Sequence, residues 1–538
     1  MTENLAFSHK NYLTVSLVFF FIFVFFVRAE PPVFDVIILG GTIVDGTGQK
    51  IYKADLGIKG DKIAAIGEFT GREANLVIDA KGKIVCPGFI DVHTHCDRGI
   101  RAVPTADNYI LQGVTTVVGG NCGEHPYPLV KFFHELEGKG ISPNFACLAG
   151  HNTIRRLIMG HAMNKPDENQ LLKMKALIVK EMKAGALGFS TGLSYLPGTY
   201  SDTEELVELT SVVAWYDGIY ASHIRDQGTK IKEAIEEAIM IGERNGLRVQ
   251  ISHIKLASDD VWKNLELITR PVENAMERGV RIAMDQYPYT ATSSGLTSSF
   301  PSWCFEGGWG AFRNRIGDIE TVGKIKAHII EQRLSSTKAI NKMETIYIAR
   351  FGPHPEYEGK NIKEILLMKG LEPDVSAGLD LIIDIERAGG ASCVFFQMTE
   401  KDVEELMRLP YVMHASDGGI QAYGRGVPHP RNYGTFPRII ARYVKEKGIL
   451  SLEEAVRKMS SFPAEFLELD RRGKIAEGMY ADINIIDFEN FKDTATYDKP
   501  HQYCTGLHWV FVNGIPVVEQ GQHTGRRPGH VIYGPGKN

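Results

Sequence analysis

The chain has 538 residues, 43% of them hydrophobic, and a formal net charge of -5 from 60 basic and 65 acidic residues. This length is enough for one large domain with accessory parts, or for two to three domains. A nearly balanced charge without long charged runs gives no bulk electrostatic reason to expect nucleic-acid binding. Seven cysteines in so long a chain do not make a disulfide framework, and the odd number leaves at least one thiol unpaired.

An uncharged apolar run lies near the N-terminus, at residues 12–27 between Lys10 and Arg28. It is shorter than the roughly 20 residues that a membrane-spanning helix needs. A basic flank, an apolar centre and Ala29 just after it are typical of a signal peptide. We therefore expect residues 1–31 to direct the protein into the secretory pathway or another extracytoplasmic compartment. An uncleaved anchor that tethers the protein to a membrane is the alternative.

Patterns typical of β-hairpins occur at both ends of the remaining chain. They span residues 35–48, 54–68, 473–489 and 508–521. Two such ends of one chain can pair with each other beside a larger domain. We therefore predict a small composite β domain made from residues 32–86 and 466–538.

Between these ends, apolar β-rich runs recur, and most of them are separated by segments with a helical pattern. The runs span residues 88–95, 114–123, 145–151, 186–193, 218–223, 248–255, 281–289 and 411–419. Residues 230–246 are an intervening helix, with apolar residues at helical spacing and Gly246 at the end. Parallel strands that are buried on both faces are nearly continuous in apolar residues. We therefore predict an α/β fold with a (β/α)8 TIM-type barrel over residues 87–465.

The interval between the seventh and eighth runs is too long for one helix and its loops. It extends from Tyr289 to Tyr411. Residues 290–380, approximately, are therefore expected to form an insertion between strands 7 and 8. The aromatic and glycine-rich stretch 301–310 suits a lid or a pocket wall better than a linker.

Residues that can bind a metal occur at the C-terminal ends of these runs. His93 and His95 lie two apart on one strand, so their side chains share a face. Cys122, His223 and His253 lie at or near the ends of the second, fifth and sixth runs. The C-terminal strand ends of a barrel form one rim, and imidazoles with a thiolate are ligands that zinc prefers. Each residue alone has an ordinary explanation as a packed side chain, so the predicted zinc site depends on all five.

Asp417 lies at the end of the last run, in the sequence Ala-Ser-Asp-Gly-Gly. An aspartate in such a place is also common as a turn or cap residue. Beside a metal, however, a carboxylate can take a proton from the attacking water and return it to a leaving amine. We therefore predict that Asp417 is the catalytic residue of a hydrolase.

Five motifs in this order resemble the amidohydrolase superfamily, and most closely its D-aminoacylases, the N-acyl-D-amino-acid deacylases. The motifs are His-Thr-His at 93–95, Gly-Asn-Cys-Gly at 120–123, Ser-His-Ile-Arg-Asp at 222–226, Ile-Ser-His-Ile-Lys at 251–255 and Ser-Asp-Gly-Gly at 416–419. Further matching stretches are 150–160, 189–198, 429–438 and 459–483. The resemblance covers essentially residues 34–530.

This resemblance implies a particular set of metal ligands. Many amidohydrolases bridge two metals with a carboxylated lysine of the fourth strand, but run 186–193 contains no lysine. D-aminoacylases use a cysteine of the second strand instead. The residues that match their tight zinc site are Cys122, His223 and His253. Those that match a second, weaker site are His93, His95, Cys122 and Asp417.

The resemblance also implies residues that bind the substrate. They are Tyr195, Lys255, Tyr287, Ser293 and Arg431, with Tyr289 and Ser294 as nearby alternatives for Tyr287 and Ser293. Lys255 and Arg431 would hold a free α-carboxylate, the first as a point charge and the second as a planar fork. Tyr195 would position or polarise the carbonyl of the bond to be cleaved.

The expected function is zinc-dependent hydrolysis of N-acyl-D-amino acids to a carboxylate and a free D-amino acid. A cyclic-amide hydrolase or deaminase on the same scaffold is an alternative, but Lys255 and Arg431 suit an open-chain carboxylate better. A non-catalytic scaffold of the amidohydrolase type is a second alternative. The presence of all six rim residues argues against it.

Overall fold

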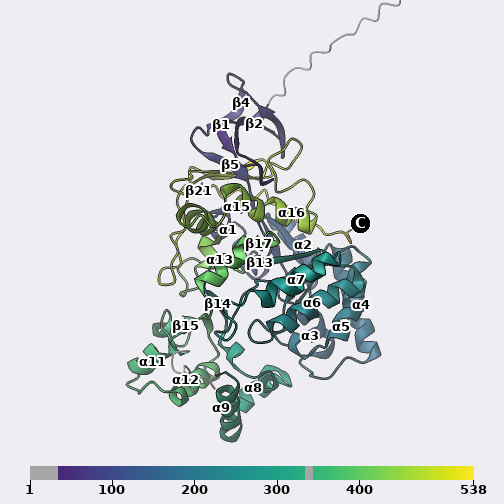
Figure 1. The fold of residues 1–538 in the computed structure, drawn as a ribbon, viewed down its shortest axis with the longest axis vertical. Coiled ribbons are helices and arrows are strands. Elements are labelled where there is room, and N and C mark those ends of the chain that lie inside the picture. Colours follow the sequence, from purple (N-terminus) through teal and green to yellow (C-terminus); the bar gives the residue numbers. More distant parts are fainter. Residues whose placement is uncertain (1–33, 334–342, 538) are drawn as a thin grey trace, which may run out of the picture. The chain divides into compact units, whose positions relative to one another are not determined.

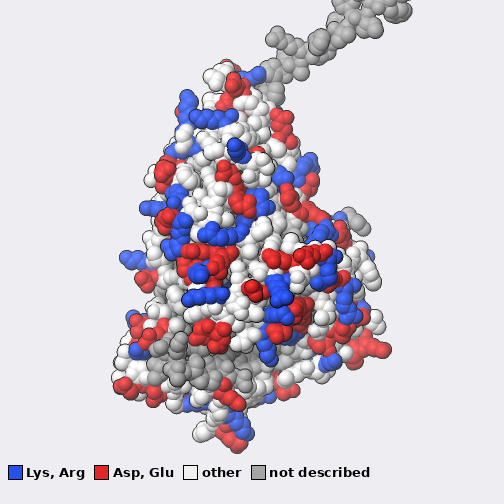
Figure 2. Space-filling view, viewed as in Figure 1, with Lys and Arg blue, Asp and Glu red and all other residues white. Residues whose placement is uncertain are grey.

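The computed structural model describes residues 34–333 and 343–537. Residues 1–31, expected to form a signal peptide or an anchor, lie outside the described part, so export remains a prediction from the sequence. Among the described residues, no helix is both long enough and apolar enough to cross a membrane. On the face shown in Figure 2, Lys and Arg side chains are interspersed with Asp and Glu side chains.

Strands from both ends of the chain pair in one nine-stranded sheet (Figure 1). The N-terminal strands are β1 (Phe34–Ile43), β2 (Tyr52–Lys59), β3 (Lys62–Gly67), β4 (Ala74–Asp79) and β5 (Ile84–Pro87). The C-terminal strands are β18 (Ile483–Ile486), β19 (Leu507–Val512), β20 (Ile515–Glu519) and β21 (Gln522–His523). Strand β5 joins the two sets, because it pairs parallel with β1 and antiparallel with β18. Ile38, Ile58 and Ile485 lie in the apolar core of this sheet.

Two parallel sheets carry the central part of the chain. The first contains β6 (Phe89–Asp91), β7 (Val114–Gly119) and β8 (Asn144–Cys147). The second contains β9 (Ala149–Gly150), β10 (Gly188–Gly192), β11 (Ile219–His223), β12 (Arg248–Ile251), β13 (Ile282–Gln286) and β17 (Val412–His414). Leu148 alone separates β8 from β9, and a parallel bridge between Thr94 and Gly418 links β6 to β17. The two sheets therefore contact each other at both edges.

Helices follow most of the parallel strands and cover them. They are α1 (Asp107–Ile110), α2 (Leu129–Lys139), α3 (His151–Met159), α4 (Glu168–Ala184), α5 (Thr203–Ala214), α6 (Ile231–Asn245), α7 (Glu266–Glu277), α13 (Glu400–Arg408), α14 (Arg431–Arg438), α15 (Leu452–Met459) and α16 (Ser461–Leu467). Residues Ile439–Glu446 form a π-helix after α14. The helix predicted at 230–246 is confirmed as α6, which buries Ile231, Ile235 and Ile239 and ends at Gly246 with φ +67°.

The segment between β13 and β17 has its own small sheet and its own apolar core. Its strands are β14 (Ala291–Gly295), β15 (Ile346–Arg350) and β16 (Ser392–Phe396), and its helices are α8 (Gly308–Gly317), α9 (Ile319–Arg333), α11 (Ile362–Met368) and α12 (Val375–Arg387). Short 3-10 helices lie at Cys96–Arg98, Gly198–Tyr200, Leu296–Ser299, Ser302–Phe305 and Pro355–Tyr357. The insertion extends to Phe396 rather than to about 380, because β16 pairs antiparallel with both β14 and β15. Cys304 and Phe305, from the stretch expected to be a lid, are buried in this core.

Glu386, at the end of α12, supplies a prediction about stability. Its side chain is buried, and its Oε1 has no hydrogen-bond partner in the described part of the chain. Burial raises the pKa of Glu386 to about 7. The unfolded value is about 4.3, so its contribution to stability is full below that pH and is lost as the pH rises through 7. We expect Glu386→Gln to raise the free energy of unfolding by about 3 kcal/mol at pH 9 and hardly at pH 4.

Urea unfolding at the two pH values measures this difference. Glu372→Gln, a change at an exposed position of the same insertion, is the control and should have little effect at either pH. If Glu386→Gln raised the free energy of unfolding equally at both pH values, unfolding would not change the protonation of this carboxyl.

Candidate metal centre

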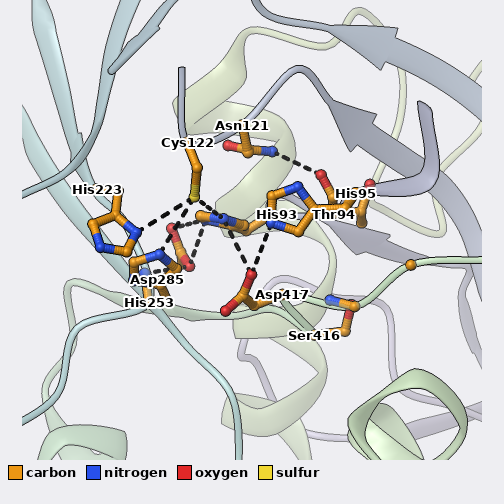
Figure 3. Close-up of polar contacts among 12 residues, drawn as sticks. His93, Thr94, His95, Asn121, Cys122, His223, His253, Asp285, Ser416 and Asp417 are labelled. Carbon is orange, nitrogen blue, oxygen red and sulfur yellow. Dashed lines mark hydrogen bonds and ion pairs between the residues drawn. The ribbon is translucent and has the colours of Figure 1, made fainter. Parts of the chain in front are cut away.

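The six candidate ligands meet at the C-terminal ends of the parallel strands (Figure 3). His93 and His95 follow β6, Cys122 follows β7, His223 ends β11, His253 follows β12 and Asp417 follows β17. His95 Nε2 lies 3.2 Å from Asp417 Oδ1, and His93 Nε2 lies 3.6 Å from the same oxygen. Residues up to 324 positions apart in the chain therefore form one cluster.

Cys122 is at the centre of this cluster. Its Sγ lies 3.4 Å from His93 Nε2, 3.6 Å from His223 Nδ1 and 3.5 Å from His253 Nε2. Ligand atoms around one tetrahedral zinc ion, with bonds of about 2.0–2.3 Å, lie at similar distances from one another. The donor set of one thiol, imidazoles and a carboxylate therefore fits zinc.

Among the residues that the structure describes, two groups of potential ligands are compact enough for an ion, with all their ligand atoms within 4.8 Å of one another. The first is His93, Cys122 and His253, and the second is His93, His95 and Asp417. His223 contacts Cys122 but belongs to neither group. The first group therefore shares Cys122 and His253 with the tight site that the resemblance implies, and has His93 where that site has His223.

Three of the six residues have a left-handed backbone, which is uncommon for residues other than glycine. The φ angle is 54° at Cys122, 36° at His253 and 50° at Asp417. Hydrogen bonds hold two of these backbones in place: the His253 amide donates to Asp285 Oδ1 at 2.8 Å, and the Asp417 amide donates to the His93 carbonyl at 2.9 Å. Such strain is concentrated at functional sites, where the surrounding structure fixes the side-chain direction.

Neighbouring charges set the protonation of the candidate ligands. Burial alone raises the pKa of the Cys122 thiol, but the charge of His93 and hydrogen bonds from His223 and His253 outweigh it and hold that pKa well below its ordinary value. Burial, assisted by Lys255, lowers the pKa of His253 to about 3. A thiolate and a neutral imidazole are the forms that bind metals.

Asp417 is also held in its charged form. Burial opposes ionisation, but the guanidinium of Arg431 and a hydrogen bond from His95 outweigh it, so the pKa of Asp417 lies well below its ordinary value. Arg431 Nη1 donates to Asp417 Oδ2 at 2.8 Å. A carboxylate beside the metal ligands can therefore accept a proton.

Asp285, a residue that the sequence analysis did not identify, supports two of the ligands. It lies one residue before the end of β13 and is fully buried. Its Oδ1 lies 3.2 Å from His93 Nδ1, and its carboxylate accepts from the amide of His253 and from Gln250 Nε2. A proton on His93 Nδ1 leaves Nε2 free to face Cys122, as in many metal sites where a carboxylate orients a histidine. The signal in the sequence was a carboxylate inside the apolar run 281–289.

The other histidines have supporting contacts of the same kind. Ser194 Oγ lies 2.7 Å from His223 Nε2, on the ring edge opposite Cys122. Gln227 Nε2 and Lys255 Nζ each lie 3.1 Å from His253 Nδ1. Ser194 and Gln227 lie in the loops after β10 and β11, and no pattern in the sequence pointed to either residue.

The structure places four of the expected substrate residues beside the cluster. Arg431 and Lys255 face one ring, with the guanidinium carbon 4.9 Å and the ammonium nitrogen 5.4 Å from the ring centre of Tyr287. The Tyr195 ring lies 4.5 Å from the His223 ring. Tyr289, the alternative to Tyr287, instead faces Arg438 and His429.

Ser293 differs from the other expected substrate residues. It lies on β14, opposite Val394 of β16. Burial raises the pKa of Tyr195, and the neighbouring Ser294 opposes this rise, which places Ser294 near the Tyr195 hydroxyl. Because adjacent strand residues face opposite sides, the structure brings the alternative Ser294, rather than Ser293, to Tyr195.

Comparison with known proteins identifies the class. Residues 76–313 and 357–518 match the model of the amidohydrolase family. A D-aminoacylase of Alcaligenes xylosoxydans xylosoxydans is 32% identical over 528 residues, which cover 94% of this chain and 99% of the relative. The chain belongs to the amidohydrolase family.

Solved structures agree with this assignment. An N-acyl-D-glutamate deacylase from Bordetella bronchiseptica, in complex with zinc and a phosphonate mimic of the tetrahedral intermediate, is 31% identical with a TM-score of 0.80. The match covers 93% of this chain and all of that one. A D-aminoacylase structure concerned with a binuclear metal centre is 30% identical, with a TM-score of 0.78 and coverage of 93% and 99%. The predicted resemblance to D-aminoacylases, and an amidohydrolase fold of α/β type, are confirmed.

Proposed function

We propose that this protein hydrolyses the amide bond of N-acyl-D-amino acids to a carboxylate and a free D-amino acid. The observation that carries the proposal is a pair of buried cations, Arg431 and Lys255, next to a cluster of metal-binding side chains. The cations suit the free carboxylate of an acyl amino acid, and the cluster suits a hydrolytic zinc ion. The D-aminoacylase and the N-acyl-D-glutamate deacylase that match nearly the whole chain support this substrate class.

We propose one tight zinc site and a second, weaker one. Cys122 and His253 would hold the tight ion together with His93 or His223, and His93, His95 and Asp417 would form the weaker site. The zinc and the binuclear metal centre in the two related structures support both parts of this assignment. Zinc, when bound, would acidify water and polarise the amide carbonyl.

Side chains of the protein would carry out proton transfer, substrate binding and positioning of the ligands. Asp417, whose pKa the Arg431 guanidinium holds well below its ordinary value, would take the proton from the attacking water and return it to the leaving nitrogen. Arg431 and Lys255 would hold the α-carboxylate, and the Tyr195 hydroxyl would donate to the carbonyl oxygen as it becomes negative. Asp285 and Ser194 would keep the histidine ligands in place.

We also propose that the parallel strands close into a (β/α)8 barrel, with residues 87–465 as the metal-binding domain. The contacts between β8 and β9 and between Thr94 and Gly418 support closure at both edges. The nine-stranded sheet would be the small composite domain of residues 32–86 and 466–538. The ligands would then lie on the carboxyl rim, where barrel enzymes have their active sites.

The alternatives are less well supported. A cyclic amide without an acidic substituent has no free carboxylate to engage Arg431 and Lys255, and the two related deacylases match this chain over nearly its whole length. A non-catalytic scaffold has no need for a thiolate, an ionised aspartate and four histidines in one buried cluster. Deacylation of a linear substrate uses all of these groups.

Arg431→Lys tests the carboxylate site. Lysine keeps the charge but loses the planar fork. We therefore expect KM for an N-acyl-D-amino acid to rise by about tenfold or more, and by at least as large a factor as kcat falls. An N-acyl amine without a carboxylate should be a poor substrate of the normal enzyme, and Arg431→Lys should hardly lower that poor rate. Steady-state kinetics on both substrates measure this.

Arg425→Lys, a matched change at an exposed position in the loop before α14, is the control. Hydrolysis of the N-acyl amine as fast as of the amino-acid derivative would show that Arg431 and Lys255 do not bind a carboxylate. The proposed substrate class would then lose its main structural support.

A further inference from the structure

Asn152 is a fully buried residue at the start of α3. It packs against Gly123, after β7, and against Gly192, at the end of β10. Its Nδ2 donates to the carbonyl of Gly192 at 3.1 Å, and lies 3.4 Å and 3.5 Å from the carbonyls of Tyr195 and Leu196. Its Oδ1 accepts from the amide of Gly192 at 3.2 Å. All four contacts go to one turn, residues 192–196, which follows β10.

These contacts allow only one orientation of the amide. The nitrogen faces three carbonyl oxygens and the oxygen faces an N–H group, so a rotated amide would oppose like groups on both sides. Asp would place a carboxylate oxygen against three carbonyl oxygens, and neither it nor Ala can donate. The position therefore needs asparagine for its donor, and not only for its volume.

The surrounding backbone leaves little room for the turn to move. A Cβ atom at Gly123, the residue after Cys122, would lie 2.1 Å from Asn152 Oδ1, and one at Gly198 would lie 2.6 Å from it. A Cβ atom at Gly192 would lie 2.2 Å from the Cys122 carbonyl. The turn is thus packed between Asn152 and the backbone that carries the central thiolate.

The turn carries two side chains that reach the metal centre. Ser194 Oγ lies 2.7 Å from His223 Nε2. The Tyr195 ring lies 4.5 Å from the His223 ring. Leu193 donates from its amide to the His223 carbonyl at 2.9 Å, which ties the turn to β11. The side-chain hydrogen bonds of Asn152 all go to this turn and none goes to a candidate ligand, so they would act on the reaction through the turn.

We infer that Asn152 is a positioning residue for the reaction: its amide sets the turn at residues 192–196, and through it the Tyr195 hydroxyl that faces the substrate carbonyl. This role rests on the proposed deacylase function. A displacement of about 1 Å in a group that acts on the transition state costs up to about 10²-fold in rate. Because Tyr195 would act on the developing oxyanion, we expect the displacement to lower kcat and to change KM little.

The test is a double-mutant cycle between Asn152→Asp and Tyr195→Phe on the zinc-loaded protein. We expect Asn152→Asp to lower kcat by about tenfold or more with little change in KM. In the Tyr195→Phe background, the same change should cost less than about threefold, because the hydroxyl that it displaces is already absent. Asn152→Ala provides the same comparison if the aspartate variant folds poorly.

Asn484→Asp is the matched control. Asn484 is an equally buried asparagine of β18, and its Nδ2 donates to the carbonyl of Gly113 at 2.8 Å. A merely structural role for Asn152 predicts that both aspartate variants lower the melting temperature and leave kcat per folded molecule unchanged. Equal losses of kcat from Asn152→Asp with and without the Tyr195 hydroxyl would overturn the inference.

A crystal structure of Asn152→Asp gives a readout that does not depend on activity. The inference predicts a displaced turn and a displaced Tyr195 hydroxyl, and an unchanged turn overturns it. If the normal protein hydrolyses no N-acyl-D-amino acid, the proposed function fails, while the crystal structure still decides whether Asn152 positions Tyr195.

Discussion

Replacing Cys122 by alanine is expected to remove most of the bound zinc and nearly all of the hydrolytic activity. The thiolate lies within 3.6 Å of three imidazoles, and its charge is what those imidazoles stabilise in the folded protein. Without it, the first compact group keeps only two ligands, His93 and His253, too few for a stable zinc site. We expect kcat/KM to fall by about 10³-fold or more, and zinc to fall below about a tenth of an equivalent per chain.

Elemental analysis after gel filtration and a kinetic assay of the same sample measure both effects. Cys147→Ala is the matched control, because Cys147 is also buried at the end of a parallel strand but contacts the Leu148 carbonyl instead of a histidine. The control should keep its zinc. If Cys122→Ala keeps full zinc and normal turnover, Cys122 is a packing residue and the ligand set is wrong.

Replacing Asp417 by asparagine is expected to lower kcat by about 10²-fold or more while the fold is kept. Asparagine has nearly the same size and tolerates the left-handed backbone that residue 417 adopts, with φ 50°. It cannot take up the proton of water, so both proton transfers assigned to Asp417 are lost. The loss should therefore appear in kcat at saturating substrate, in contrast to the KM effect expected for Arg431→Lys.

Steady-state kinetics, zinc analysis and thermal unfolding of the same sample separate these effects. Asp470→Asn, at an exposed position, is the control and should leave kcat unchanged. If Asp417→Asn turns over at the normal rate with normal zinc content, another group transfers the protons.

The sequence predicted that the candidate ligands would meet because their positions follow one structural rule. Parallel strands end at one rim, so His223 and His253, at the ends of neighbouring strands β11 and β12, were expected to meet, and their rings lie 4.3 Å apart. The motifs added Lys255 and Arg431, which patterns of apolar residues cannot distinguish from surface charges. The structure places both beside Tyr287.

Other features depend on tertiary contacts that no local pattern contains. Asp285 resembles any polar residue in a strand until His93, nearly 200 positions earlier in the chain, is placed against it. Asn152 and Ser194 act through the shape of a turn. The end of the insertion was missed because the five residues of β16 form a strand only through pairing with β14 and β15. Side-chain geometry likewise decides whether His93 or His223 joins Cys122 and His253 as the third ligand of the proposed tight site.

The most direct test of the proposed function is a paired assay of the zinc-loaded protein on the N-acetyl derivatives of the D and L forms of the same amino acids, with hydantoins alongside. We predict release of free D-amino acid, loss of that activity on chelation and its recovery when zinc is restored. Hydrolysis of the L series or of hydantoins in preference to the D series would contradict the account, and so would an absence of hydrolysis by protein that contains zinc.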